Sequence, residues 1–324
     1  MKILIVAGAR PNFIKIAPIV RELSKPENKI FFNYKLVHTG QHYDYSLSES
    51  FFKALNIPDP DYYLNVGSFS HAVQTAKIMV EFEKVCIEEK PEMILVFGDV
   101  NSTIACALTA KKMNILVSHI ESGLRSGDLT MPEEINRIAT DSISDFYFTT
   151  EQSANQNLMN EGVDREKIFF TGNVMIDSLI FNKVEIDRHS KIQNQKKYGV
   201  ITLHRPSNVD SISKFISLIK TFNQISKSIK LFFPVHPRTK MIITDGKLES
   251  MFSNDIELID PMGYIEFVSL CKNAEVIFTD SGGVQEESTY YGVPCITLRD
   301  NTERPITIEV GTNFLVGAEH EKII

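Results

Sequence analysis

Short apolar runs alternate with amphipathic segments along most of the chain. The runs Lys2–Ala7, Met93–Phe97 and Val276–Thr279 are short and rich in β-branched and aromatic residues, which is typical of buried strands. Residues 72–90 and 212–225 repeat apolar positions at helical spacing. Strands that alternate with helices form mostly parallel sheets covered by helices. The pattern therefore predicts an α/β protein.

The same reading places the other elements. Pro18 falls inside the first helical segment, which predicts a kink or a fresh helix start there. The strand at 145–149 is expected to close the first sheet. Further strands are expected at 35–39, 115–119, 200–203, 231–235 and 294–298, and further helices at 104–113, from Pro132 onward, at 264–271 and at 284–291.

The alternation weakens between residues 172 and 197, where 188–197 is polar and basic with little periodicity. Domain junctions fall in such segments. A second alternating series follows. We therefore predict a domain at 1–172 and another at 173–324, both Rossmann-like with mostly parallel sheets and facing each other across a cleft.

Composition limits the possible functions. The chain has 324 residues, of which 43% are hydrophobic and 23% charged, so two domains can each bury a core. The net charge of −7 argues against general binding to nucleic acid or to acidic membranes. No apolar run approaches the roughly 18 residues of a membrane helix. The four cysteines are scattered, which predicts free thiols and a reducing, cytoplasmic location.

A glycine-rich turn follows the strand at 276–279. Ser281, Gly282 and Gly283 separate this strand from a helix, so backbone N–H groups and the partly positive helix start can approach an anion such as a diphosphate. Glu287 lies about one turn into the helix, where a carboxylate suits sugar hydroxyls better than phosphate. The alternative is an ordinary strand-to-helix turn, with Ser281 as N-cap and the glutamates in solvent.

Polar residues also follow several other strands. Ligands of open α/β sheets bind at the carboxyl ends of strands. Taken singly, an Asp there is usually a turn or cap residue and a His is usually structural. Their concentration predicts a site in which an anion clamp adjoins acid/base groups. These positions are Arg10, Asp99, Glu121, His204, His236 and Ser281, with Glu133 at a helix start and Lys15 and Arg304 adding positive charge.

Cofactor motifs are lacking. The polar cluster has no metal-ligand spacing, which favours catalysis without a metal. The sequence contains neither the glycine pattern of a dinucleotide-binding turn nor a phosphate-loop lysine motif. We expect no cofactor.

Several motifs occur in a characteristic order. They are Gly8-Ala9-Arg10-Pro11 with Lys15-Ile16-Ala17-Pro18, Thr39-Gly40-Gln41-His42, Gly98-Asp99, His119-Ile120-Glu121-Ser122-Gly123-Leu124-Arg125, Pro132-Glu133-Glu134-Ile135-Asn136-Arg137, Thr171-Gly172-Asn173, Asp280-Ser281-Gly282-Gly283 with Gln285-Glu286-Glu287, and Arg299-Asp300 with Thr302-Glu303-Arg304-Pro305. Together they resemble the UDP-N-acetylglucosamine 2-epimerase family of the non-hydrolysing type, from the first strand to about Gly311. The resemblance implies the two-domain fold of GT-B glycosyltransferases.

The resemblance also implies roles for individual residues. Ser281, Gly282 and Gly283 would hold the diphosphate, and Glu287 the uridine ribose. Asp99, Glu121, Glu133 and His204 match the acid/base set proposed for the family. Arg10, His236 and Arg304 match positions on the phosphate side, and Phe267 matches a position on the uracil side. Lys15 matches an active-site lysine.

The implied reaction interconverts UDP-N-acetylglucosamine and UDP-N-acetylmannosamine through elimination of UDP to a 2-acetamidoglucal and re-addition. A UDP-sugar would be the ligand, and the protein would be a homodimer that binds neither nucleic acid nor membrane. The alternatives are a hydrolysing epimerase that releases N-acetylmannosamine, an epimerase of a modified UDP-acetamido sugar, a glycosyltransferase, or a non-catalytic nucleotide-sugar sensor.

Three departures from the family pattern limit what can be carried over. His204-Arg205-Pro206-Ser207 lacks the second arginine and the glutamate of many bacterial members, and Tyr43-Asp44 follows Gln41-His42 where some regulated members have other polar residues. Activation by substrate is therefore not carried over to this chain. Residues 319–324 look like the first turn of a helix, and we expect the chain to be truncated there.

Overall fold

The computed structural model describes residues 1–40, 52, 54–189 and 197–324, apart from the side chain of Arg10. The chain divides into two compact units, Met1–Ile180 and Phe181–Ile324, which are described separately. The domain bounds expected from the sequence, 1–172 and 173–324, stay a prediction, as does the cleft between the domains.

Unit 1 is built on a seven-stranded parallel sheet. Its order is β3-β2-β1-β4-β5-β6-β7, so the chain starts in the middle of the sheet and moves outward in both directions. The strands are β1 (Lys2–Ala7), β2 (Asn33–His38), β3 (Tyr62–Tyr63), β4 (Met93–Phe97), β5 (Leu116–Ile120), β6 (Phe146–Thr149) and β7 (Ile168–Phe170). All their pairings are parallel. This order leaves the carboxyl ends of β4 and β5 side by side.

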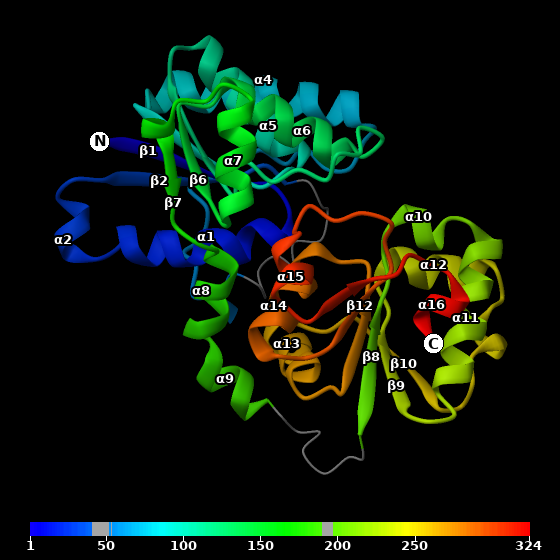
Figure 1. Cartoon of the computed structure of the whole chain (residues 1–324). Helices are drawn as coiled ribbons and strands as arrows, with labels where there is room; N and C mark the ends of the chain where they lie inside the picture. Colours follow the sequence, from blue (N-terminus) through cyan, green and yellow to red (C-terminus); the bar gives the residue numbers. More distant parts are fainter. Residues whose placement is uncertain (41–51, 53, 190–196) are drawn as a thin grey trace. The chain divides into compact units, whose positions relative to one another are not determined.

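Helices cover both faces of this sheet. The helices α4 (His71–Glu89), α5 (Asn101–Lys112) and α6 (Pro132–Ile143) lie side by side on one face, and α1 (Arg10–Leu23) lies on the other (Figure 1). Apolar residues of β1 and β4 pack against Ile78 and Phe82 of α4 and Cys106 of α5. Further helical segments whose bounds lie within the described residues are α2 (Pro26–Lys29), α7 (Gln152–Asn160), the 3-10 turn η1 (Arg165–Lys167) and α8 (Val174–Phe181), whose last residue belongs to unit 2.

One expectation for unit 1 is wrong. The strand at 145–149 does not close the sheet, because β7 pairs with β6 beyond it. With only three residues, β7 is too short for a repeating pattern of apolar positions to predict it. Of the two outcomes expected at Pro18, the fresh helix start does not occur, because α1 runs through this residue, and a kink there stays a prediction. A proline lacks the N–H that would bond the carbonyl four residues earlier. That carbonyl, of Ile14, instead accepts a hydrogen bond from the Ser178 hydroxyl at 2.5 Å.

Unit 2 is built on a six-stranded parallel sheet of order β10-β9-β8-β11-β12-β13. The strands are β8 (Tyr198–Thr202), β9 (Lys230–Pro234), β10 (Ile256–Ile259), β11 (Val276–Thr279), β12 (Cys295–Thr297) and β13 (Asn313–Leu315). The helices are α9 (Lys183–Arg188), α10 (Pro206–Val209), α11 (Ile212–Ile225), α12 (Pro237–Asp245), α13 (Tyr264–Lys272), α14 (Gly282–Tyr291), α15 (Ile306–Glu309) and α16 (His320–Ile323), with the 3-10 turn η2 (Glu249–Met251). Both units are thus mostly parallel α/β sheets, as predicted.

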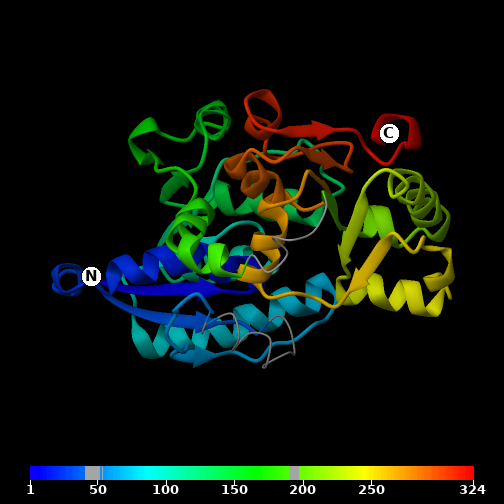
Figure 2. The same ribbon diagram turned by 90° about the horizontal axis from the view of Figure 1, so that it is seen from below.

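The second sheet also has a core on each face. Phe215 and Phe222 of α11 pack on one face together with Ile323 of α16, which lies beside α11 (Figure 2). Leu270 of α13 and Val284 of α14 pack on the other face. The site elements α13 and α14 are thus fixed by their own apolar cluster.

The four cysteines are buried free thiols, as the sequence indicates. Within the described residues, no helix is long and apolar enough to cross a membrane.

Candidate functional site

In unit 1, Asp99 and Glu121 follow the neighbouring strands β4 and β5. Both lie where the backbone is unusual. Gly98 has φ +61°, and its N–H donates to the Ile120 carbonyl at 3.0 Å. Glu121 has φ +70°, a left-handed conformation that costs energy for a residue with a side chain. The tertiary structure therefore enforces this conformation at the strand end.

Lys15 projects from α1 toward Glu121 and forms an ion pair with it. The two side chains are only 8% and 5% exposed. A buried charge is tolerated only when it is paired, and each of these groups is the other's partner. A Cβ atom at Gly98 would lie 2.8 Å from the Lys15 amine and 3.3 Å from a Glu121 carboxylate oxygen. Only glycine leaves room for this pair.

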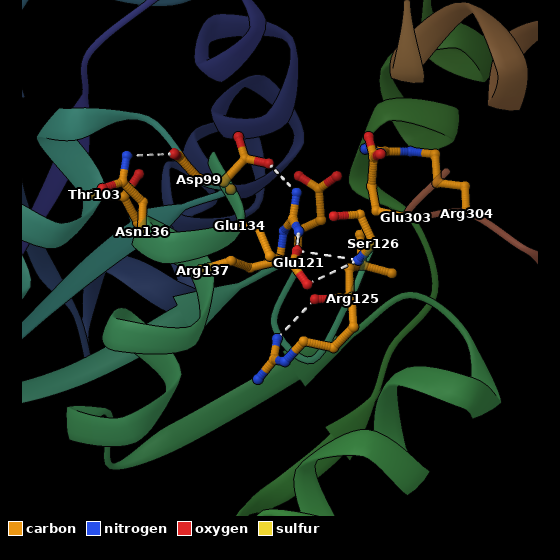
Figure 3. A network of polar contacts seen from close by, with 12 residues as sticks. Asp99, Thr103, Glu121, Arg125, Ser126, Glu134, Asn136, Arg137, Glu303 and Arg304 are labelled. Atoms are coloured by element: carbon orange, nitrogen blue, oxygen red, sulfur yellow. Dashed lines mark hydrogen bonds and ion pairs between the residues drawn. The ribbon is translucent and has the colours of Figure 1, made fainter. Parts of the chain in front are cut away.

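Asp99 is held by residues of α6 (Figure 3). Its carboxylate accepts a bond from Arg137 at 2.7 Å, and its backbone carbonyl accepts one from Asn136 at 2.9 Å. Arg137 is fully buried and also pairs with Glu134, whose carboxylate accepts the N–H of Ser126 at 3.0 Å. The Asp99 side chain stays 27% exposed, so it can still meet a ligand.

The structure therefore brings Asp99, Glu121 and Lys15 together around Gly98. Glu133 lies half-buried in the first turn of α6, but the glutamate that joins the Arg137 network is its neighbour Glu134. Sequence reasoning quoted Glu134 and Arg137 in a motif without giving them a role. Their i, i+3 spacing with opposite charges was the available signal.

Two expectations for this unit fall outside the described residues. They are the side chain of Arg10 and the segment Gln41-His42-Tyr43-Asp44.

In unit 2, the glycine turn opens α14 as predicted, but the helix begins at Gly282 rather than at Val284. Ser281 stands at the N-cap position, and its side chain makes no capping hydrogen bond. A Cβ atom at Gly282 would lie 2.9 Å from a guanidinium nitrogen of Arg304 and 2.7 Å from a carboxylate oxygen of Glu303. A buried arginine thus adjoins a helix N-terminus, and both favour an anion.

Arg304 is itself held by carboxylates. Its guanidinium pairs with Glu303 at 2.6 Å and with Glu286 at 2.9 Å, and Arg299 pairs with Glu303 at 2.8 Å. All four side chains are at most 8% exposed, and their formal charges cancel. This network fixes the position of Arg304 at the start of α14.

Glu287 is 5% exposed, and burial raises its pKa to about 8. The Tyr264 hydroxyl lowers this pKa and the Glu286 carboxylate raises it. The Tyr264 hydroxyl is close enough for this effect but makes no hydrogen bond of ordinary geometry. Because Glu286 is only 8% exposed, the alternative in which both glutamates are solvated is wrong.

His204 follows β8 and is oriented by Asp280, which is wholly buried at the end of β11. Asp280 accepts the backbone N–H groups of His204 and Arg205 at 3.1 and 3.0 Å and an Asn208 amide at 3.2 Å, and it lies 3.1 Å from Nδ1 of His204. Burial alone would raise the pKa of Asp280, but His204, Arg205 and Asn208 bring it below its usual range. The ionised Asp280 holds the Nδ1 proton, which leaves Nε2 of His204 for a ligand.

The sequence motif Asp280-Ser281-Gly282-Gly283 contains Asp280, but sequence reasoning assigned this residue no role. Two other predicted residues belong to this unit. His236 is the N-cap of α12, and its ring centroid is 5.5 Å from that of His204. Phe267 of α13 is half-buried against the apolar cluster under α14. Among the described residues, no His, Cys, Asp or Glu group is arranged to hold a metal ion.

The fold and these residues define a two-unit α/β protein of glycosyltransferase-like architecture, with carboxylates at the strand ends of one unit and, in the other, a helix start beside a buried, ion-paired arginine. The chain belongs to the UDP-N-acetylglucosamine 2-epimerase family, which matches residues 24–324.

Three relatives support this assignment. A UDP-N-acetylglucosamine 2-epimerase of Methanococcus maripaludis is 45% identical over 100% of this chain and 90% of its own. The crystal structure of Methanocaldococcus jannaschii UDP-GlcNAc 2-epimerase in complex with UDP-GlcNAc and UDP is 44% identical, with a TM-score of 0.92 over 100% of this chain and 91% of that one. A UDP-2,3-diacetamido-2,3-dideoxy-D-glucuronate 2-epimerase of Pseudomonas aeruginosa is 40% identical over 100% of this chain and 90% of its own.

A glycosyltransferase from Streptomyces sp. SF2575 shares the fold alone, with 10% identity and a TM-score of 0.51 over 92% of this chain and 81% of its own. This likeness agrees with the predicted glycosyltransferase-like architecture.

Proposed function

We propose that the protein interconverts UDP-N-acetylglucosamine and UDP-N-acetylmannosamine. The observation that carries this proposal is the likeness to the Methanocaldococcus jannaschii enzyme with UDP-GlcNAc and UDP, which extends over this whole chain. The acid/base groups at the strand ends of unit 1 and the anion-favouring start of α14 in unit 2 agree with such a substrate.

The chemistry explains why several ionisable groups are needed. The hydrogen on C2 of the sugar has no carbonyl beside it to make it acidic. The C1–O bond therefore breaks first, UDP leaves with the bonding electrons, and positive charge develops at C1. A base then removes the C2 proton and leaves a 2-acetamidoglucal. Protonation at C2 from the opposite face and return of UDP to C1 give the epimer.

We assign the proton transfers to Asp99, Glu121, Glu133 and His204. General acid/base catalysis of this kind contributes about 10²–10⁴-fold in rate. Lys15 is ion-paired with Glu121, and Asp280 leaves Nε2 of His204 for a ligand.

The departing diphosphate is assigned to the start of α14. Backbone N–H groups at Ser281, Gly282 and Gly283, with Arg304 beside them, would stabilise the developing negative charge. Phosphate contacts are also assigned to Arg10 and His236, the uridine ribose to Glu287 and the uracil side to Phe267.

The test is NMR of UDP-N-acetylglucosamine incubated with the protein in D2O without added metal or NAD. We expect both epimers, with deuterium at C2. Accumulation of the manno epimer with hydrogen retained at C2 would rule out elimination. Stoichiometric free N-acetylmannosamine would identify a hydrolysing enzyme instead.

A modified sugar is the second candidate, because the Pseudomonas aeruginosa relative is named for a diacetamido glucuronate. Incubating the protein with each UDP-sugar separately distinguishes the two, since only the true substrate should exchange its C2 hydrogen at a catalytic rate.

A cytoplasmic homodimer is the expected form of the protein. The buried free thiols suit a reducing compartment. Val73, Val80 and Ile87 are 44%, 55% and 61% exposed on α4, and their seven-residue spacing puts them on one face of that helix. Sedimentation should report a dimer that Val80→Lys weakens and Ile30→Lys, at an 80% exposed position elsewhere, does not. A monomeric parent would refute this assignment.

A further inference from the structure

His119 is a buried histidine that the proposed reaction does not use. It lies on β5, two residues before Glu121, and its side chain is 0% exposed. Nδ1 lies 2.7 Å from a carboxylate oxygen of Asp141 on α6. Nε2 lies 2.8 Å from the backbone carbonyl oxygen of Gly98, which follows β4. One imidazole ring therefore links helix α6 to the loop that follows β4.

Both partners of this ring are hydrogen-bond acceptors. A backbone carbonyl can only accept. Burial would raise the pKa of Asp141, but His119 and then Arg125 bring it below its usual range, so the carboxylate is ionised. It also accepts the N–H of Gly123 at 3.1 Å. Both ring nitrogens of His119 must therefore donate, which requires the imidazolium form.

Arg125 is the second charged partner of Asp141. It pairs with Asp141 at 2.7 Å and with Glu161, which is 41% exposed, at 2.6 Å. The buried pairing with Arg125 favours the ionised form of Asp141 without any contribution from His119.

The Gly98 carbonyl belongs to the peptide group that joins Gly98 to Asp99. His119 holds this carbonyl, and the Ile120 carbonyl holds the N–H of Gly98 at 3.0 Å. The loop is therefore fixed on both sides of Gly98 and directly before Asp99. The Lys15–Glu121 pair lies against the same glycine. A shift of this peptide would move Asp99 relative to Glu121.

We propose that His119 is a buried imidazolium that positions Asp99 for proton transfer by holding the Gly98–Asp99 peptide. It is a positioning residue, because it acts through Gly98 rather than on the sugar. The positioning role rests on the proposed function of Asp99, whereas the charge state does not.

The charge state is tested by ¹⁵N NMR of histidine-labelled protein at neutral pH, with the His119 signals assigned by their loss in His119→Asn. We expect both ring nitrogens to be protonated and both to couple to a hydrogen. A neutral tautomer, with one bare nitrogen, would overturn the proposal. This readout needs no substrate, so it stands even if the parent protein proves inactive and the proposed function fails.

The positioning role is tested by two substitutions that each keep one donor. The Gln amide can take the place of Nε2 and keep the bond to Gly98, whereas the Asn amide can take the place of Nδ1 and keep the bond to Asp141. We expect kcat to fall about 10²-fold in His119→Asn, because small displacements of a reacting group cost that much. His119→Gln should lose clearly less, and the Kd for UDP should be unchanged in both.

Tyr147→Phe is the matched control. The Tyr147 hydroxyl donates to the backbone carbonyl of Asp141 at 2.8 Å but does not touch Gly98. This variant should lower Tm and keep the parental kcat. Folded His119→Asn with parental kcat would overturn the positioning role. Equal losses of kcat in the Asn and Gln variants would overturn it as well, because they would show that the Gly98 bond is irrelevant.

Discussion

At the scale of single residues, Glu287 is a carboxyl group whose burial decides its charge. Its pKa of about 8 in the folded protein compares with the usual 4.5. Between these values the folded chain keeps a proton that the unfolded chain has lost. The stability contributed by Glu287 is therefore fully present below about pH 4.5 and is lost progressively as the pH rises through about 8.

We expect Glu287→Gln to remove this dependence, because the amide stays neutral at every pH. As the pH rises from 5 to 8, the free energy of unfolding of the variant should increase relative to that of the parent by on the order of a few kcal/mol. Urea denaturation of both proteins at several pH values measures the difference. Parallel profiles would show that Glu287 is ionised in the folded protein.

Gly282 is a second residue with a specific requirement. An alanine Cβ would lie 2.9 Å from Arg304 and 2.7 Å from Glu303, so the guanidinium must move away from the start of α14. We expect Gly282→Ala to weaken UDP binding by about 1.5–3 kcal/mol, the range for hydrogen bonds to a charged group.

Calorimetric titration with UDP measures this loss. Gly292→Ala at the other end of α14 is the control. There φ is +71° and a Cβ atom meets open space, so it should cost stability but not UDP affinity. Parental UDP affinity in Gly282→Ala would place the phosphate contacts elsewhere.

At the scale of elements, most helices and strands follow from local pattern. Strands such as β1, β4 and β11 are continuous apolar runs because both faces of a parallel sheet are covered. Asp99 and Glu121 could be found because they directly follow such strands. Their partners could not, because Arg137, Lys15 and Asp280 become neighbours only when distant segments meet. The continuity of α1 through Pro18 likewise depends on Ser178, which is far away in the sequence.

The Ser178 contact gives a prediction at this scale. Ser178→Ala removes the donor that satisfies the Ile14 carbonyl, and an unpaired buried acceptor costs about 1–3 kcal/mol. The urea midpoint should fall accordingly. Ser142→Ala, which removes an exposed bond to the Ala139 carbonyl, should change stability by less than about 0.5 kcal/mol. Equal midpoints for the two variants would show that the Ser178 bond does not support α1.

At the scale of the whole molecule, both units contribute residues to the proposed reaction. Asp99, Glu121 and Glu133 of unit 1 and His204 of unit 2 are assigned to proton transfer, whereas most of the contacts assigned to UDP come from unit 2. Substituting the acid/base residues of unit 1 should therefore change turnover without changing UDP affinity. Asp99→Asn and Glu121→Gln should lower kcat about 10²–10⁴-fold and leave the Kd for UDP unchanged.

Stability must be separated from catalysis in this experiment, since Asp99 pairs with Arg137 and Glu121 with Lys15, and a lost partner leaves a buried charge. Asp145→Asn supplies the control. Asp145 is also ion-paired, to Lys111 at 2.5 Å, but it accepts the N–H of Val117 near the amino end of β5, whereas Glu121 follows the carboxyl end of the same strand. The Asp145→Asn variant should lose stability and keep the parental turnover per folded molecule. If Asp99→Asn and Glu121→Gln behave like Asp145→Asn, the strand-end carboxylates are structural and the chemistry lies elsewhere.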